Sequence, residues 1–143
     1  MHDIPTLGHE DAERAIAAIR SAAVTRGTPV VIAVADSHGE PIALLRMDGA
    51  AYPSAQVAMN KAFTAARLRR PTSLTGRNVR NPETGFDIGY YGDPRFVGFG
   101  GGLPAIVDGR TLGAVAVSGL SQAEDEELAA IGIEAIMDPT AGG

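Results

Sequence analysis

The spacing of apolar residues along the chain predicts three long helices. Between His9 and Arg26, apolar residues recur every three or four positions, as on the buried face of an amphipathic helix. The same spacing covers Tyr52–Leu68, and this helix should end before Pro71 because the residue preceding a proline resists the helical conformation. A capping-box sequence at 121–124, Ser-Gln-Ala-Glu, opens a last helix that runs to about Met137.

Continuous apolar segments predict two hairpins, one on each side of the second helix. Pro29–Ala35 and Ile42–Met47 are joined by a short polar turn. Ala105–Val107 and Leu112–Val117 flank Asp108-Gly109, a dipeptide that readily adopts the positive φ values of a tight turn. Segments 29–35 and 112–117 are apolar on successive residues, so we expect both faces of these strands to be covered.

The stretch between the second helix and the second hairpin is rich in proline and glycine. We therefore expect Thr72–Pro94 to be a long irregular loop, which in a compact domain is typical of a functional segment. Phe96–Phe99 should be a further strand that enters Gly100–Gly102, where missing side chains allow a bend in the sheet or the close approach of a ligand. The elements in order are helix, two strands, helix, three strands and helix. This order predicts an α+β domain with a five-stranded antiparallel sheet flanked by helices.

Length and composition limit what this domain can be. The chain has 143 residues, enough for one domain, with a core expected at about 6–137 and a loose tail at 139–143. It is 45% hydrophobic but only 5% aromatic, which predicts a core of small aliphatic side chains. The absence of cysteine excludes disulfides, thiolate metal sites and a cysteine nucleophile. No two of the histidines are spaced as zinc ligands, so no metal site is expected.

Charge is unevenly distributed along the chain. The formal net charge of -5 argues against general binding of nucleic acid, and no apolar run is long enough to span a membrane, so we expect a cytoplasmic protein. Segment 61–80 contains basic residues and no acid, whereas segment 121–143 contains acids and no base. These blocks are either solvated helix faces, or complementary surfaces that join subunits or attract an anionic ligand. The basic block comprises Lys61, Arg67, Arg69, Arg70, Arg77 and Arg80.

Several side chains are candidates for binding or chemistry beside the glycine run. Arginine binds carboxylates in a bidentate manner, tyrosine combines an apolar face with a polar tip, and a partly buried lysine has a lowered pKa suited to proton transfer or a Schiff base. We expect a site where they meet, completed by a neighbouring subunit. The candidate ligand-binding residues are Arg46, Tyr90, Tyr91, Arg95, Gly100, Gly101 and Gly102. If the protein is an enzyme, the candidate catalytic residues are Arg46, Lys61, Tyr91 and Asp93.

Five short motifs, taken in order, resemble a known family. They are VADSHG at 34–39, LLRMDGA at 44–50, KAFTAARL at 61–68 with Pro71-Thr72 after it, GGGLP at 100–104 and GAVAVSGL at 113–120. Together they are similar to the GlcG-like or haem-degrading (HbpS-like) domains, which also form the carboxy-terminal part of PduO-type corrinoid proteins. The resemblance extends from about Thr6 to Met137. It implies a profilin-like or roadblock-like five-stranded sheet and an even-numbered homo-oligomer, from dimer to octamer.

The resemblance leaves two functions open. One is a small-molecule binding protein for haem or a related tetrapyrrole, in which a histidine near the amino terminus holds the iron. His9 is then the candidate haem ligand, ahead of His2. The other is a small catabolic enzyme, of deaminase or tautomerase type, that acts on a carboxylated, aminomuconate-like metabolite. In either case the partner is a small anionic molecule.

Overall fold

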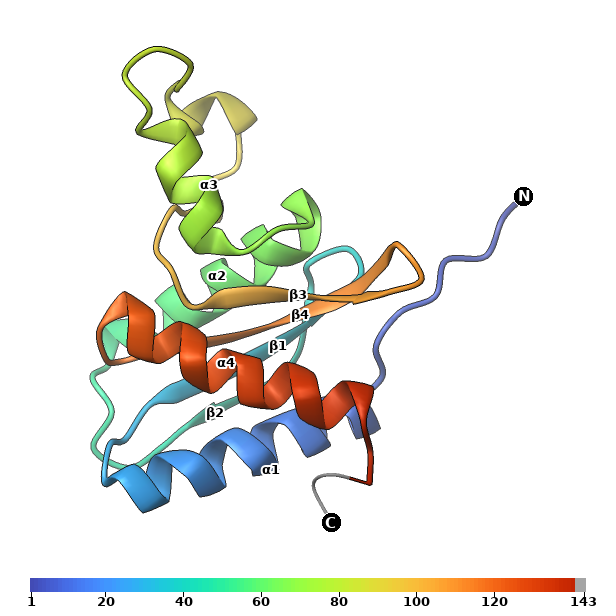
Figure 1. Cartoon of the computed structure of the whole chain (residues 1–143), viewed down its shortest axis with the longest axis vertical. Coiled ribbons are helices and arrows are strands. Elements are labelled where there is room, and N and C mark those ends of the chain that lie inside the picture. Colours follow the sequence, from blue (N-terminus) through green and yellow to red (C-terminus); the bar gives the residue numbers. More distant parts are fainter. Residues whose placement is uncertain (141–143) are drawn as a thin grey trace.

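The computed structural model describes residues 1–140, which form one antiparallel sheet with helices on both faces (Figure 1). The four strands and four α-helices alternate in the order α-β-β-α-α-β-β-α, with a short 3-10 helix, η1, before the third strand. The elements are α1 (His9–Arg26), β1 (Val31–Asp36), β2 (Pro41–Arg46), α2 (Pro53–Leu68), α3 (Thr72–Val79), η1 (Ile88–Tyr91), β3 (Gly102–Val107), β4 (Arg110–Ser118) and α4 (Gln122–Met137).

The sheet has the strand order β2-β1-β4-β3, so β1 and β4 lie in its centre. β1 pairs with β4 from Val31 opposite Ser118 to Asp36 opposite Gly113. Every residue from Val31 to Ala35 is buried, which confirms that this apolar segment forms a strand covered on both faces. The pairing of β1 with β4 also brings the turn that follows β1 close to the start of β4.

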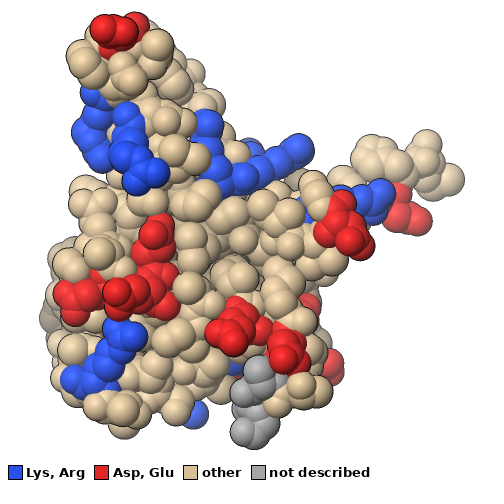
Figure 2. All heavy atoms as spheres, in the orientation of Figure 1, with Lys and Arg blue, Asp and Glu red and all other residues tan. Residues whose placement is uncertain are grey.

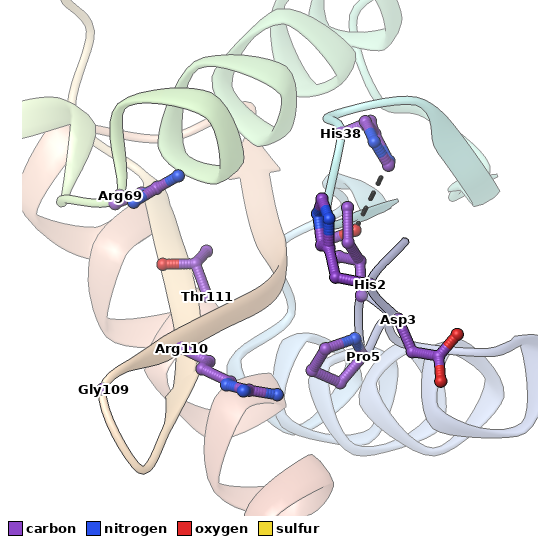
Figure 3. A pocket seen from close by; sticks show the side chains of 10 residues that line it. His2, Asp3, Pro5, His38, Arg69, Gly109, Arg110 and Thr111 are labelled. Carbon is purple, nitrogen blue, oxygen red and sulfur yellow. Dashed lines mark hydrogen bonds between the residues drawn. The ribbon is translucent and has the colours of Figure 1, made fainter.

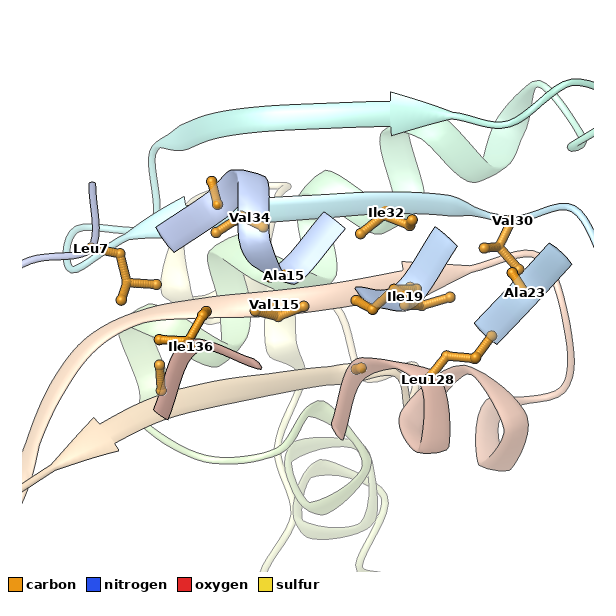
Figure 4. Close-up of a cluster of buried hydrophobic side chains, with 14 residues drawn as sticks. Leu7, Ala15, Ile19, Ala23, Val30, Ile32, Val34, Val115, Leu128 and Ile136 are labelled. Atoms are coloured by element: carbon orange, nitrogen blue, oxygen red, sulfur yellow. The ribbon is translucent and has the colours of Figure 1, made fainter. Parts of the chain in front are cut away.

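The face of the sheet toward α1 and α4 is packed with branched aliphatic side chains (Figure 4). Ile32 and Val34 of β1 and Val115 of β4 are fully buried there. Ile19 of α1 and Leu128 of α4 fill the space above them, and both are fully buried as well. The predicted core of small aliphatic residues is therefore present, with its larger members on this face.

The opposite face is covered by α2 and is lined mainly by alanine. Ala33 and Ala116 of the central strands contact Ala58 and Ala62 of α2, and all four are buried. Small side chains on both partners allow the helix to approach the sheet closely. The helix is nonetheless polar at several buried positions, among them Lys61 and Thr64.

The prediction of a fifth strand at Phe96–Phe99 is wrong, because this segment runs alongside α2 instead of pairing in the sheet. The Phe96 ring lies 4.9 Å from the Phe63 ring, centroid to centroid, and the backbone N–H of Val97 donates to Thr64 Oγ1 at 3.0 Å. Side chains of α2 thus cover this segment and accept a backbone hydrogen bond from it, in place of the hydrogen bonds that a neighbouring strand would have supplied.

Part of the expected long loop is also helical. α3 occupies Thr72–Val79 and η1 occupies Ile88–Tyr91, so Thr72–Pro94 is not irregular throughout. Gly76 lies within α3, and because glycine is typical of loops, the sequence pattern did not indicate a helix here. A Cβ at this position would lie 2.1 Å from the Gly98 carbonyl oxygen. The glycine therefore serves close packing of α3 on segment 96–99. In Figure 1, α3 and the chain after it rise from the body of the molecule.

The three long helices agree with the sequence, since α1 has the predicted bounds and α2 and α4 differ from theirs by one residue or so. Of the tail expected at 139–143, residues 141–143 lie outside the described residues. Within residues 1–140, no helix is both long enough and apolar enough to cross a bilayer. The resemblance of the fold to profilin-like or roadblock-like domains stays a prediction.

Candidate functional site

The glycine run is packed against protein atoms on all sides. The Gly100 N–H donates to Gln122 Oε1 at 2.7 Å, and the Gly102 N–H donates to Thr72 Oγ1 at 2.9 Å. Gly101 has φ +126, and a Cβ at this position would come within 2.8 Å of Lys61 Nζ. The three glycines therefore let the chain enter β3 between α2 and α4, and their role in binding a ligand stays a prediction.

Lys61, the only lysine of the chain, lies behind this run in a buried ion pair. Its Nζ donates to Asp125 Oδ2 at 3.0 Å and to the Val117 carbonyl oxygen at 3.0 Å. The Leu120 N–H donates to the other carboxylate oxygen of Asp125 at 3.0 Å. Burial lowers the pKa of Lys61, while the charge of Asp125 and its hydrogen bond act in the opposite direction. The pair joins α2 to α4, which lie on opposite faces of the sheet.

This contact shows that the two charge blocks meet partly within one chain. Lys61 belongs to the basic block and Asp125 to the acidic block. The same two segments are joined by a second hydrogen bond, in which the uncharged Ser73 hydroxyl donates from Oγ to Glu126 Oε1 at 2.7 Å. Assembly of several copies through the remaining charges stays a prediction.

A second group of candidate residues is brought together on the outer side of α2. Arg95 donates to Asp93 and to Glu40, and its guanidinium carbon lies 4.0 Å from the centre of the Phe63 ring. The Tyr91 ring lies 4.6 Å from that of Phe96. Hydrogen bonds from the side chain and backbone of Arg95 hold the pKa of the Asp93 carboxyl below its usual value. These contacts anchor the 86–97 segment on α2 and on the β1–β2 turn.

The remaining candidates lie apart from both groups. Arg46 is at the end of the edge strand β2, on the opposite side of the sheet from β3, and stacks over Tyr52 at 5.1 Å. Tyr90 is exposed on η1. The predicted meeting of Arg46, the tyrosine loop and the glycine run is therefore not seen within this chain.

A pocket of about 420 Å³ lies at the other end of the sheet, between the amino-terminal segment and the β3–β4 turn (Figure 3). Two imidazoles, from His2 and His38, and two guanidinium groups, from Arg69 and Arg110, line it. Figure 3 shows these side chains arranged around one open space, with Asp3 at its margin. The volume falls in the usual range for small-molecule sites, about 300–1,000 Å³.

The fold places these four side chains from four separate segments. The pairing of β1 with β4 sets the His38 turn beside the β3–β4 turn that precedes Arg110. Arg69 ends α2 in the left-handed conformation, with φ 60, which turns the chain at this point. The Arg67 Nε donates to the His38 carbonyl oxygen at 2.7 Å and so fixes the end of α2 on the turn.

The amino-terminal segment that carries His2 is attached to the same region. The Leu7 N–H donates to the Leu112 carbonyl oxygen at 2.8 Å, and Thr6 Oγ1 accepts from the Ser37 N–H at 2.9 Å. His38 Nδ1 lies 3.4 Å from Ser37 Oγ, and its Nε2 forms no hydrogen bond with residues 1–140, so that nitrogen is available to a ligand. The sequence indicated a turn at His38 but not this convergence, because only the β1–β4 register reveals it.

His9, the candidate haem ligand, is the first residue of α1 and is exposed. It is separated from the residues that line the pocket by Thr6 and Leu7, which are bonded to the β1–β2 turn and to β4. Its role as a ligand stays a prediction. The pocket contains His2, the second candidate from the sequence, and adds His38 as an alternative.

The fold and this pocket define a class, a small α+β domain with one antiparallel sheet and a surface pocket of about 420 Å³. Within that class, the chain belongs to the HbpS-like family. The family model described as haem degrading protein HbpS-like matches residues 7–134. The recognition from the five motifs is thereby confirmed.

Curated relatives agree with this assignment. Protein GlcG of Escherichia coli K12 is 40% identical over 112 residues, which cover 78% of this chain and 81% of GlcG. A 15.0 kDa protein encoded between dhaT and dhaS in Citrobacter freundii is 35% identical over 126 residues, 88% of this chain and 89% of its own.

Solved structures show the same fold. ORFY of Klebsiella pneumoniae has a TM-score of 0.88 at 29% identity, over 96% of this chain and 94% of its own. A double mutant of HbpS from Streptomyces reticuli has a TM-score of 0.82 at 31% identity, over 94% and 89%. PduOC, solved as a complex with haem, has a TM-score of 0.82 at 28% identity, over 91% and 94%.

Proposed function

We propose that this chain binds haem, or a related flat tetrapyrrole with carboxylate groups, in the pocket between the amino-terminal segment and the β3–β4 turn. The observation that carries the proposal is the presence of two imidazoles and two guanidinium groups around one space, His2 and His38 with Arg69 and Arg110. The family description and the haem complex of PduOC support it from outside the chain.

The donor set fits the chemistry of the group. Imidazole nitrogen is a common axial ligand of haem iron, and either His2 or His38 can supply it. Guanidinium groups bind carboxylates, and we assign the two propionates to Arg69 and Arg110, which line the pocket. When bound, haem supplies an iron centre with a redox potential set by its axial ligand. The role of the protein is to hold the macrocycle and to balance the charge of its carboxylates.

Titration of untagged protein with hemin tests the proposal. We expect a shifted Soret band with the wild-type chain and its loss in the double variant His2→Ala/His38→Ala. Arg69→Gln and Arg110→Gln should keep the band and weaken binding, because each removes a propionate contact. Arg20→Gln, an exposed arginine of α1, is the matched control and should bind as the wild type does.

The single variant His9→Ala separates the pocket from the ligand predicted by the sequence. If the proposal is right, His9→Ala keeps the Soret shift. If His9→Ala alone abolishes the shift while the His2→Ala/His38→Ala variant retains it, the iron is held at the start of α1 and the pocket is not the haem site.

The enzymatic alternative gains no specific observation. Lys61 is enclosed with Asp125, Tyr91 and Asp93 belong to the group around Arg95 on the outer side of α2, and Arg46 lies apart from both on β2. Deaminase or tautomerase activity on a carboxylated metabolite therefore stays a prediction without a placed set of catalytic groups.

A further inference from the structure

A second hollow, of about 610 Å³, lies between α3 and α4 and is separate from the pocket described above. Leu74 of α3, Leu103 of β3 and Ala130 of α4 give it an apolar floor. Arg77 lies along one wall, and Glu126 and Glu127 lie along the other. Neither the family assignment nor the proposed haem site accounts for this groove.

The two walls have opposite charge. Figure 2 shows Lys and Arg gathered over the part of the molecule that rises above the sheet and Asp and Glu gathered over α4, with uncharged surface between them. Of the residues that line the groove, Arg77 belongs to α3, and Glu126 and Glu127 belong to α4. A ligand in the groove would therefore meet a cation on one side and anions on the other.

The charged groups of the walls retain free bonding capacity. Among residues 1–140, Arg77 makes no hydrogen bond or ion pair, although Glu126 and Glu127 line the same groove. Glu126 accepts from Ser73 through Oε1 at 2.7 Å, which fixes the carboxylate and leaves Oε2 for another donor. Glu127 binds Arg26 only at the surface, with Oε2 3.3 Å from the Arg26 Nη1.

We propose that this groove binds an elongated zwitterion with an apolar middle, a molecule of the ω-amino carboxylate class. Its carboxylate pairs with Arg77, its ammonium group pairs with Glu126 and Glu127, and its methylene groups lie on Leu74 and Leu103. The separation of the charges onto opposite walls selects a ligand whose own charges are separated by a chain. An α-amino acid, with both charges on one carbon, fits less well.

The probe is 6-aminohexanoate, with hexanoate, hexylamine and norleucine as comparison compounds. Binding is measured by calorimetry and by ligand-observed NMR at low ionic strength, because salt screens exposed charges. We expect 6-aminohexanoate to bind about tenfold more tightly than each comparison compound, since each lacks one charge-assisted contact or has the wrong spacing. Equal affinity for norleucine, or for either singly charged compound, would overturn the proposal.

Variants locate the binding in the groove. Arg77→Gln, and separately Glu126→Gln/Glu127→Gln, should each weaken binding of 6-aminohexanoate about tenfold, while Arg20→Gln should leave it unchanged. The absence of measurable binding to the wild type would also overturn the proposal, since it would mean that Arg77 pairs with the acids of its own chain. Hemin titration of Arg77→Gln should match the wild type, so failure at one site is distinguishable from failure at the other.

Discussion

The two faces of the sheet are packed by different means. Toward α1 and α4, β-branched and leucine side chains such as Ile32, Val115 and Leu128 fill the interior by volume. Toward α2, the contact is made by alanines such as Ala33 and Ala62, and it ends at the buried Lys61–Asp125 pair. The first face is stabilised by the apolar area it buries, and the second depends on close fit and on matched polar groups.

The difference shows where each face tolerates change. A face packed by volume loses stability when a side chain is shortened, because a cavity is left. A face packed by close approach loses stability when a side chain is lengthened, because the helix must move away from the sheet. The buried ion pair between Lys61 and Asp125 adds a third way to lose stability, because removing one partner leaves the other charge buried and unpaired.

The largest effect is expected from Lys61→Met. The substitution roughly preserves the volume and leaves the Asp125 carboxylate buried without its cation, which costs about 3–5 kcal/mol when a buried pair is broken. Total stabilities of domains are about 5–15 kcal/mol, so the variant should be severely destabilised in urea unfolding. The double variant Lys61→Met/Asp125→Asn removes both charges, keeps an acceptor for the Leu120 N–H, and should recover most of the loss. No recovery would show that Lys61 acts through packing and not through charge.

Leu128→Ala tests the face packed by volume. Leu128 is fully buried between α4 and the sheet, and shortening it should cost about 2–5 kcal/mol, depending on how far the surroundings collapse. Thermal and urea unfolding measure the loss. Ala130→Gly, on the groove side of the same helix, is the matched control and should cost only the difference in helix propensity, about 1 kcal/mol. A loss no greater than in the control would contradict the assigned packing.

Ala62→Leu tests the face packed by close approach. Ala62, on the side of α2 that faces the sheet, is 1% exposed, and the added carbon atoms should destabilise the protein by about 1–3 kcal/mol. The matched variant Ala17→Leu places the same side chain on an exposed position of α1 and should have little effect. Unchanged stability of Ala62→Leu would mean that α2 does not lie as close to the sheet as the alanine contacts indicate.

The smallest effect concerns a half-buried pair beside α2, Asp93 with Arg95. Because Arg95 lowers the pKa of Asp93 in the folded chain below 3.8, their pairing contributes to stability above pH 3.8 and is lost as the pH falls through the lowered pKa. NMR titration of the carboxyl should give a midpoint below 3.8 in the wild type, moving upward in Arg95→Gln. A midpoint that does not move would assign the shift to another group.

The spacing of apolar residues predicted the three long helices and the central strands. It did not predict the structure of α3 and segment 96–99, where contacts between distant residues outweigh the local sequence pattern. The strands β1 and β4 were predictable because their apolar residues are consecutive, and α1 because its apolar residues recur at helical spacing. The sequence pattern predicts a loop at Gly76 in α3, although this glycine is needed for the contact with Gly98. It predicts a strand at the apolar segment Phe96–Phe99, although this segment packs on α2.

The candidate sites show a similar limit. The sequence placed Lys61 on the helix at 52–68 and made a lowered pKa conditional on its burial, but its partner Asp125 is 64 residues away and no local pattern connects them. The pocket around His2, His38, Arg69 and Arg110 depends on the order of strands in the sheet. A sequence pattern that predicts hairpins does not predict which hairpins lie side by side, so residues drawn from four segments could not be grouped in advance.

The attachment of the amino-terminal segment beside the pocket has a practical consequence for making the protein. His2, Asp3, Ile4 and Pro5 line the pocket, so any residues fused ahead of Met1 begin next to it. A polyhistidine tag at that end would place additional imidazoles within reach of an iron porphyrin and would give a Soret shift of its own. A tag joined after Gly143 instead follows α4 in the chain and leaves the residues ahead of Thr6 as they are.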